Sequence, residues 1–458
     1  MKKICAVLLS LLLALILVVP MSGCTIDMGK TGNDDDDPAD VPSGPDVEVN
    51  EDADVELTIG LLGKEQEKSV MQAWINAFQR KNPEVSITIT KNMGGMAEII
   101  NWDSAGELPD IVWTAGDQHS PYSGSGYFQD LSDESKFEGS SDFFADFYDA
   151  LIDSTHYSSE DEGIWFVPRD YNRLVIYINE TAFDQAGVEI PENDWTWEDF
   201  TQTCQALMDA GVRKAIEWKK WRPVYTTMLT NFGGSYIDDE GNFALNSAEG
   251  QACYEFYEQI YSRDGFAIAG EGASFKAYSG VLSSSVPMIV DVRPQLPDYV
   301  ATAYSGNWSV TARAFPNYVQ ADGSAGFVGT GCSGYGITKA CTDEAKLDWA
   351  WKFLKWCMSE EGYNEVAYLG NIVPAIKTMR SSGDWTEYTY GGISIGYEAF
   401  VAENTSDIFL NYYNPLPNQK QDTVIRMIDT FWNKAGTGVS FASAVAELER
   451  EFNAYMSE

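Results

Sequence analysis

Hydrophobic and polar positions follow two different periods in the first part of the chain's folded body. Every second residue is apolar over residues 55–62 and again over 85–90, which predicts two strands. Between them, apolar residues recur at helical spacing over 70–78, and Asn82-Pro83 ends that predicted helix. A strand, a helix and a strand within about 35 residues are typical of a βαβ unit with parallel strands. A third short strand is expected over residues 111–113.

The same two periods continue through the rest of the chain. Residues 164–168 and 174–179 read as two strands joined by a polar loop, and 286–291 as a buried strand. Helices are expected where a side chain that can cap a helix precedes a helical apolar pattern, at Thr196, Ser247 and Thr342. Two more helices are expected near the end of the chain. Alternating strands and helices without an internal repeat predict an α/β fold.

The N-terminus carries a targeting pattern. Lys2 and Lys3 precede an apolar run over residues 4–19, which is shorter than the roughly 20 residues of a membrane-spanning helix. Small residues stand directly before Cys24, as in a bacterial lipobox, whose cysteine receives a lipid and becomes the mature N-terminus. We therefore expect a lipoprotein signal peptide over residues 1–23 and a lipid-anchored chain facing the extracellular side of the cell membrane. An ordinary secretory signal with an incidental cysteine is the alternative.

The segment that follows the lipobox is strongly acidic. Residues 25–54 contain eleven acidic residues, one lysine and no aromatic residue. Such a segment buries too little apolar surface to offset its chain entropy, and its like charges keep it extended. Residues 24–54 are therefore expected to form a flexible linker. Metal binding by the run of four aspartates at residues 34–37 is the alternative interpretation.

Charge and length restrict the classes of partner. The chain has 69 acidic and 30 basic residues and a formal net charge of −39. This charge repels phosphates, which excludes a nucleic-acid partner and disfavours a polyanionic ligand. The body, residues 55–458, is too long for one ordinary core, so two lobes are expected.

Few residues suit catalysis or metal binding. The chain has two histidines and no Cys-x-x-Cys pair, so no metal and no cofactor is expected. Five cysteines remain in the mature chain besides Cys24, an odd number that leaves at least one free thiol. Cys332 stands in a glycine-rich segment, but neither His119 nor His156 has an evident link to it. No catalytic residue is therefore assigned.

A longer pattern emerges from five segments taken in order. They are LTIGLLGKEQEKSVMQAWINAFQRKNPEVSITI, LPDIVWTAGD with GYFQDL, IWFVPRDYNRLVIYINETAFDQAGVEIPENDWTWEDF, GVLSSSVPMIVD and GYGITKACTDEAKLDWAWKFLKWCMSEEG. Each segment alone is a weak signal. In this order, across nearly all of residues 55–458, they resemble the extracellular solute-binding proteins of ABC importers, in the sugar-binding group that includes maltose-binding protein.

The resemblance implies a two-lobed α/β clamp with mostly parallel sheets and discontinuous lobes joined by hinge strands. It places the first lobe at residues 55–135 and 336–372, and the second at residues 136–335 and 373–458. It implies capture of a small solute, a mono- or oligosaccharide, which is then delivered to the permease subunits of an ABC importer. We expect a monomer without enzymatic activity, held at the membrane only by its lipid.

Candidate ligand contacts are polar and aromatic residues in loops that follow predicted strands, where open α/β sheets bind their ligands. Sugar hydroxyls pair with carboxylate, amide and guanidinium groups, and the C–H faces of a sugar ring pack on aromatic planes. The candidates are Lys64, Glu65, Asp117, Tyr171, Asn172, Trp221, Asp291 and Arg293. The resemblance supports Asp117, Trp221 and Asp291 in particular.

Other interpretations remain open at this point. Arg169 and Arg293 could form structural ion pairs with acidic neighbours, and most of the 14 Trp and 24 Tyr residues must be core or surface, with Trp113 and Trp165 assigned to the core. A cell-surface glycosidase would need two carboxylates about 5–9 Å apart, which so acidic a sequence does not exclude. A sensory module would reuse the clamp to contact a receptor instead of an importer.

Overall fold

The computed structural model describes residues 46–47, 49–158, 160–318, 327–402, 406–409 and 416–458. Their first sheet has the strand order β2 (Val85–Met93), β1 (Val55–Leu62), β3 (Ile111–Ala115), β12 (Ser333–Ile337) and β4 (Val167–Pro168). β1 is parallel to β2 and β3, which confirms the predicted βαβ unit. β12 runs antiparallel to both β3 and β4.

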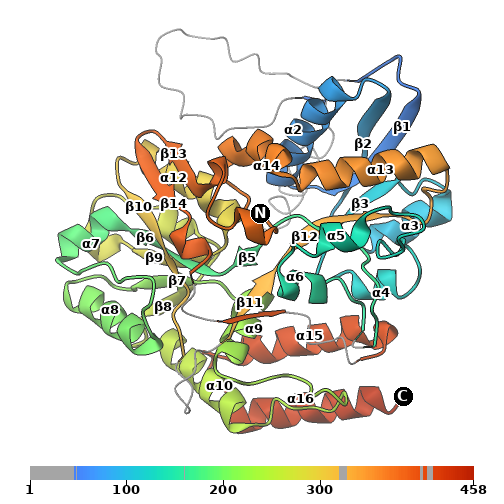
Figure 1. Ribbon diagram of the computed structural model, residues 1–458. Helices are drawn as coiled ribbons and strands as arrows, with labels where there is room; N and C mark the ends of the chain where they lie inside the picture. Colours follow the sequence, from blue (N-terminus) through green and yellow to red (C-terminus); the bar gives the residue numbers. More distant parts are fainter. Residues whose placement is uncertain (1–45, 48, 159, 319–326, 403–405, 410–415) are drawn as a thin grey trace, which may run out of the picture. The chain divides into compact units, whose positions relative to one another are not determined.

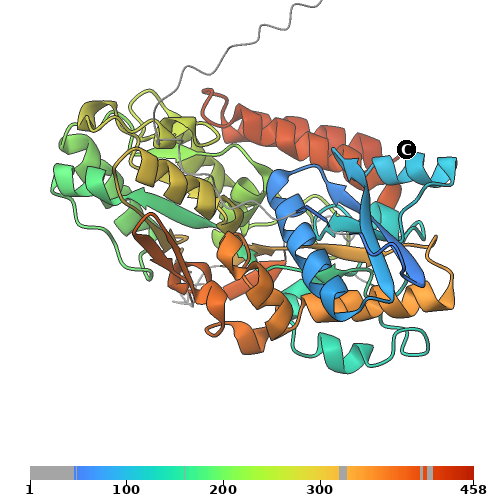
Figure 2. The ribbon, with the colours of Figure 1, turned by 90° about the horizontal axis from the view of Figure 1, so that it is seen from above.

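Helices from both ends of the sequence cover the first sheet. α2 (Glu65–Lys81) and α13 (Glu344–Cys357) both pack against β1 (Figure 1). α2 also lies beside α14 (Glu360–Val366), where the Nε1 of Trp74 donates to the Gly362 carbonyl at 2.7 Å (Figure 2). This first layer is therefore completed by residues nearly 300 positions apart.

The second sheet has the order β10 (Val310–Ala314), β6 (Val175–Asn179), β9 (Met288–Asp291), β7 (Ile216–Trp218) and β8 (Ala267–Ala269). β6 is buried on both faces. Ile176 and Ile178 join a core with helices α8 (Trp197–Asp209), α10 (Ala248–Tyr261), α15 (Asn418–Lys434) and α16 (Phe441–Met456). Val175 and Tyr177 point to the opposite face, towards α12 (Leu296–Ser305).

Smaller elements complete the described chain. Two small sheets are formed by β15 (Ser406–Phe409), β11 (Phe327–Gly331) and β5 (Asn172–Arg173), and by β13 (Glu387–Tyr390) and β14 (Ile393–Gly396). The remaining helices are α3 (Glu98–Ala105), α4 (Ser120–Ser123), α5 (Ser140–Phe144), α6 (Asp149–Asp153), α7 (Glu180–Ala186), α9 (Arg222–Asn231) and α11 (Ala273–Lys276). No helix in the described part of the chain combines the length and apolar character needed to cross a membrane.

Two of the three expected helix starts are confirmed. Thr196 forms a capping box with Asp199, and the Ser247 side chain accepts from the backbone of Gly250. The expected start at Thr342 is wrong by one residue. Asp343 caps α13, because its carboxylate accepts from the backbone N–H of Lys346 at 3.1 Å.

Three segments connect the two sheets, and they are hydrogen-bonded to one another. The Arg169 backbone N–H donates to Ser333 O at 2.8 Å, and the Tyr171 N–H donates to Val373 O at 2.9 Å. The Arg169 guanidinium binds both oxygens of Glu67 on α2, at 2.5 and 2.9 Å, and Asp170 at 2.6 Å. The charges of Glu67, Arg169 and Asp170 are therefore paired.

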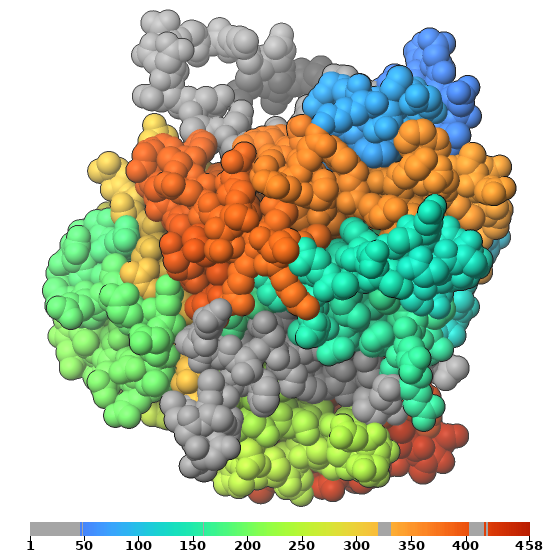
Figure 3. Space-filling view, in the orientation of Figure 1, coloured from blue at the N-terminus to red at the C-terminus, as the bar shows by residue number. Residues whose placement is uncertain are grey.

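Residues 137–168 lie with the first sheet. β4 belongs to that sheet, and Phe144 and Leu151 share a core with β1, although the expected boundary at residue 135 assigns them to the second lobe. Residues 144–149 also contact the segment after residue 374, where the Lys377 N–H donates to Asp146 O at 2.8 Å (Figure 3). The end of the expected linker is likewise attached, because Asn50 Nδ2 donates to Val85 O at 3.0 Å.

Candidate functional site

A cavity of about 260 Å³ lies where strands of both sheets end. The residues that line it lie at or just after the ends of β1 and β3 in the first sheet and of β7 and β9 in the second, and in two of the connecting segments. The lining residues are Leu62, Trp113, Ala115, Gly116, Asp117, Gln118, Asn172, Leu174, Trp221, Pro223, Val292, Gly331, Cys332 and Ser333. The carboxyl ends of strands are where open α/β sheets bind ligands.

Two polar groups of this cavity have no partner among the described residues. The indole Nε1 of Trp113 is a buried donor, and the amide Oδ1 of Asn172 is a buried acceptor. Buried polar groups are nearly always hydrogen-bonded, because desolvation without a partner is unfavourable. Two residues that line the cavity, Trp113 and Asn172, therefore each carry a buried polar atom that no described group satisfies.

Trp221 supplies an aromatic surface. Its side chain is 39% exposed, although Trp is usually mostly buried. It stands at the start of α9 but makes no side-chain capping bond there. The ring is therefore available for stacking on an apolar ring face.

Asp117 provides the carboxylate of the cavity. Burial raises the pKa of Asp117, and the guanidinium of Arg222, 3.8 Å away, opposes this rise. Arg222 also binds Asp429 of α15 at 3.3 Å. A neighbouring cavity of about 310 Å³ shares Asp117, Gln118, Trp221 and Pro223 with the first. Asp117 and Trp221 thus belong to two adjoining spaces.

Comparison with protein-family models shows which family the chain belongs to. Residues 73–390 match the family model "Bacterial extracellular solute-binding protein", which is well over half of the chain. The chain belongs to this family. Its members bind solutes and are not enzymes, as the sequence analysis expected.

Individual relatives are distant. The "Multiple sugar-binding protein" of Streptococcus mutans is 20% identical over 146 residues, 31% of this chain and 32% of that protein. The match thus spans about a third of that curated protein. Among solved structures, the GacH receptor of Streptomyces glaucescens has a TM-score of 0.69 at 15% identity, covering 89% of this chain and 100% of that one.

Two further structures show the same likeness. An ABC substrate-binding protein of Listeria monocytogenes, in complex with cycloalternan, has a TM-score of 0.67 at 16% identity, covering 88% of this chain and 99% of that one. UgpB of Mycobacterium tuberculosis, in complex with glycerophosphocholine, has a TM-score of 0.67 at 16% identity, covering 88% of this chain and 98% of that one. The expected two-lobed α/β fold is confirmed.

In this solute-binding protein, the expected contacts separate into two groups. Asp117, Asn172 and Trp221 all line the 260 Å³ cavity. Lys64 and Glu65 are exposed at the start of α2 and do not line it. They do follow β1, as predicted, but the chain enters α2 at Glu65, and of this segment only Leu62 lines the cavity.

Asp291, Arg293 and Tyr171 are held by other protein groups. Asp291 is buried and binds Lys219 at 2.6 Å and the Tyr299 hydroxyl at 2.5 Å. The ring of Tyr171 is buried against Tyr148, with centroids 4.4 Å apart. Arg293 is buried against aromatic rings and backbone carbonyls. None of the three lines the cavity.

The sequence analysis missed Trp113, which it assigned to the core. Trp113 and Ala115 of β3 and Asp117 after it all line the cavity. These residues are two apart, and side chains two apart share one face of a strand. The candidate Asp117 could therefore have pointed back to Trp113 by spacing alone.

Cys332 also lines the cavity, but its surroundings do not activate a thiolate. Burial raises the pKa of the Cys332 thiol to about 12, and its Sγ lies 3.1 Å from the Ser154 Oγ. Burial lowers the pKa of His119 to about 3, and its Nδ1 lies 2.8 Å from the Ser123 hydroxyl. A neutral thiol is a poor nucleophile, so Cys332 lines the cavity as a small, unreactive side chain. The other described cysteines are free and buried as well.

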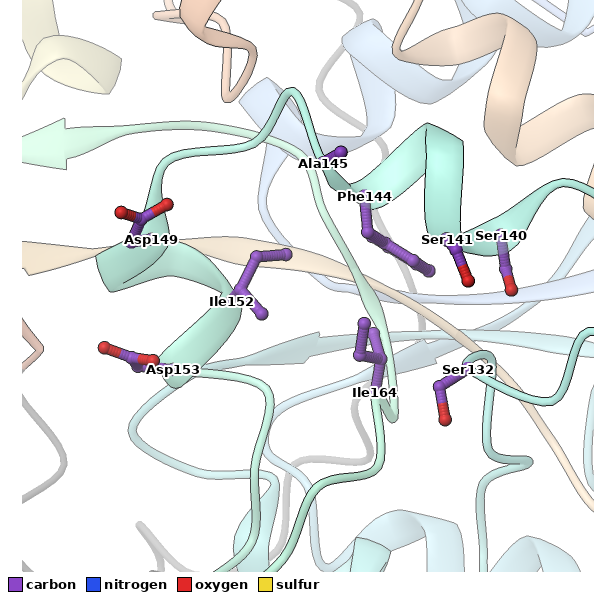
Figure 4. A pocket seen from close by; sticks show the side chains of 9 residues that line it. All are labelled: Ser132, Ser140, Ser141, Phe144, Ala145, Asp149, Ile152, Asp153 and Ile164. Atoms are coloured by element: carbon purple, nitrogen blue, oxygen red, sulfur yellow. The ribbon is translucent and has the colours of Figure 1, made fainter.

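A larger hollow of about 430 Å³ lies elsewhere, between α5 and α6. Figure 4 shows an apolar centre formed by Phe144, Ile152 and Ile164, with Asp149 and Asp153 on one side and serines on the other. Asp149 already binds Lys377 at 2.7 Å. The lining residues come from loops and short helices of one segment, away from the strand ends, so the smaller cavity is the candidate site.

Proposed function

We propose that this solute-binding protein captures a mono- or oligosaccharide outside the cell and delivers it to the permease subunits of an ABC importer. The observation that carries the proposal is the lining of the 260 Å³ cavity. It combines a half-exposed Trp221 ring with the unpartnered Trp113 Nε1 and Asn172 Oδ1 and with the Asp117 carboxylate. A sugar offers an apolar ring face together with hydroxyls that both donate and accept.

The lining favours an uncharged sugar over a phosphate ester. None of the described residues that line this cavity is Lys or Arg, and one is Asp117. Arg222, 3.8 Å from Asp117, already binds Asp429 at 3.3 Å, so a phosphate would compete with two carboxylates for this cation. Relatives named for sugars, such as the multiple sugar-binding protein, support this choice. UgpB with glycerophosphocholine marks the other ligand class that related folds accept.

Screening for the ligand tests the proposal. A ligand that binds only the folded chain raises its melting temperature. We expect a neutral sugar from a panel of sugars, polyols and glycerol phosphates to do so. A rise with glycerol phosphates alone would overturn the sugar assignment.

Asn172→Ala then tests the cavity. Losing this hydrogen bond should weaken binding of the identified sugar about 3- to 10-fold in calorimetry. Asn453→Ala is a matched control, because Asn453 is exposed on α16, and it should leave affinity unchanged. Equal affinities of the two variants would remove Asn172 from the site.

Cys24 and most of the expected linker, residues 24–45, lie outside the described residues, and we propose the lipid anchor and the flexible linker from the sequence. Cys24→Ser should release the protein into the medium, because a chain without its lipid has no stable hold on the membrane. Membrane retention of this variant in fractionated cells would contradict the anchor.

We further propose that the lobes move about the three connecting segments. Given the sheet assignments, the first lobe comprises residues 55–168 with 333–376, and the remaining body forms the second. Solute should then close the lobes as a hinge motion. X-ray scattering with and without saturating sugar measures this, and identical profiles would argue against closure.

Delivery to an importer is tested in cells. Deleting the gene should abolish uptake of the identified sugar at concentrations near its dissociation constant. Unchanged uptake together with a lost transcriptional response to that sugar would favour a sensory role instead.

A further inference from the structure

Arg293 is the buried cation that the solute site does not use. It follows β9 directly, is 1% exposed and does not line the cavity. Its Nε donates to Gly370 O at 2.7 Å and its Nη2 to Trp385 O at 3.2 Å. The guanidinium lies 4.6 Å from the centre of the Phe400 ring. Arg293 therefore ties the second sheet to the third connecting segment.

Arg293 has no anionic partner in the part of the chain that the structure describes. Arg169, which is also buried, binds two carboxylates, from Glu67 and Asp170. No carboxylate among the described residues acts on Arg293, and its Nη1 has no hydrogen-bond acceptor there. Burial lowers the pKa of Arg293 to about 10, so it is still a cation at neutral pH. A buried charge is normally paired, because desolvation is costly.

A second unpaired donor belongs to the same place. The Tyr388 side chain is 4% exposed, and its hydroxyl is buried without a partner among the described residues. Gly370, whose carbonyl binds Arg293, packs so closely on Tyr388 that a Cβ there would collide with the ring. Arg293 and Tyr388 both contact Gly370, and each carries a buried donor without an acceptor among the described residues.

We propose that a small monovalent anion, chloride under physiological conditions, binds beside Arg293 Nη1 and the Tyr388 hydroxyl. Chloride supplies the missing negative charge and accepts from both donors. Arg293 and Tyr388 are at most 4% exposed, so the site is closed to bulk solvent, which favours a small ion over a phosphate or a carboxylate ligand. The ion is separate from the solute, and it strengthens the attachment of β9 to the third connecting segment.

Halide-dependent stability tests this site in the full mature chain. At constant ionic strength, chloride should raise the melting temperature relative to gluconate, which is too bulky to bind. Above the dissociation constant, each tenfold rise in chloride should add about 1–2 °C for a chain of this length. Equal melting temperatures in both salts would overturn the proposal.

Two variants separate the site from general salt effects. Tyr388→Phe removes only the hydroxyl, and Arg293→Met removes the cation at similar volume. Both should lose most of the chloride shift. Tyr254→Phe is the matched control, because the Tyr254 hydroxyl is satisfied by Val439 O in a different core. It should keep the full shift, and an undiminished shift in Tyr388→Phe would also overturn the proposal.

Crystals grown in bromide give a direct readout. An anomalous peak in contact with Arg293 Nη1 and the Tyr388 oxygen is the expected result. An ordered water at that place without an anomalous signal would refute the ion, since water would then satisfy both donors.

Discussion

The carboxyl ends of β3 and β9 each carry an aspartate that the sequence marked as a ligand contact, but the surroundings of the two differ. Asp117, after β3, has a side chain that is 27% exposed and lies 3.8 Å from Arg222. Asp291, at the end of β9, is 1% exposed and binds Lys219 at 2.6 Å and Tyr299 at 2.5 Å. One carboxylate faces a cavity and the other is enclosed by its own lobe.

The difference teaches that a place at the end of a strand is necessary for this kind of site but not sufficient. What decides is whether neighbouring side chains already satisfy the group. Lys219 lies 72 positions before Asp291, and Tyr299 lies 8 positions after it. Both side chains bind the Oδ2 of Asp291. Asp117 has a single, more distant cation and shares its space with Trp221. Only the second arrangement leaves a carboxylate available to a solute.

The largest effect on stability is expected for a substitution of Asp291, and it tests the contrast with Asp117. Asp291→Ala should lower the free energy of unfolding by about 3–5 kcal/mol, because the buried Lys219 would keep only Glu271, exposed and 3.9 Å away, as a counter-charge. Chemical denaturation at pH 7 measures it. Asp117→Ala is the matched control and should cost less than about 1 kcal/mol, since its pair with Arg222 is partly exposed. Similar losses in the two variants would contradict the distinction.

A smaller effect is expected at Trp221. Trp221→Ala should weaken sugar binding by about 1–3 kcal/mol, because a stacked ring is lost. Unfolding should hardly change, since the ring is 39% exposed. Trp221→Phe retains a ring and should recover part of the affinity in calorimetry. Unaltered affinity of the alanine variant would remove Trp221 from the site.

The smallest effect concerns the pH dependence of stability at Asp117. Burial raises the pKa of Asp117, so the folded chain holds this proton more tightly than the unfolded chain. Stability should therefore fall as pH rises from the unfolded pKa, about 3.9, through the raised folded value. Asp117→Asn lacks this loss, and its stability relative to wild type should increase by up to about 1 kcal/mol between pH 4 and pH 7.

Urea unfolding of both proteins at several pH values measures this difference, in which other titrating groups cancel. A difference that is constant with pH would show that Arg222 offsets the burial of Asp117 completely.

Local pattern was enough for much of the fold. β1, α2 and β2 were predicted because their periodicity lies within neighbouring residues, and Asn82 ends the helix as expected. The place of β12 between β3 and β4 was not predicted from the residues, because it depends on pairing across more than 150 positions. Long-range pairing leaves no local period to read.

The site divides in the same way. The rule of strand ends led to Asp117, Asn172 and Trp221, which line one cavity. This rule could not predict that the carbonyls of Gly370 and Trp385 would accept hydrogen bonds from Arg293, because both residues lie more than 70 positions away in the sequence. Trp113 was predicted to be a core residue because a large apolar residue in a strand is usually buried. It is indeed buried, but it also lines the cavity, and its one polar atom has no partner among the described residues.

The position of β12 has a consequence for export. The first sheet needs residues 333–337 between β3 and β4, and α14 must reach α2. A chain threaded through a translocation channel from its N-terminus therefore cannot finish its first lobe until about three quarters of it has crossed. Until then β3 has an open edge, and contacts this distant in sequence form slowly. For a chain exported N-terminus first, as we propose, this interleaved connection would delay completion of the first lobe until most of the chain has crossed the membrane.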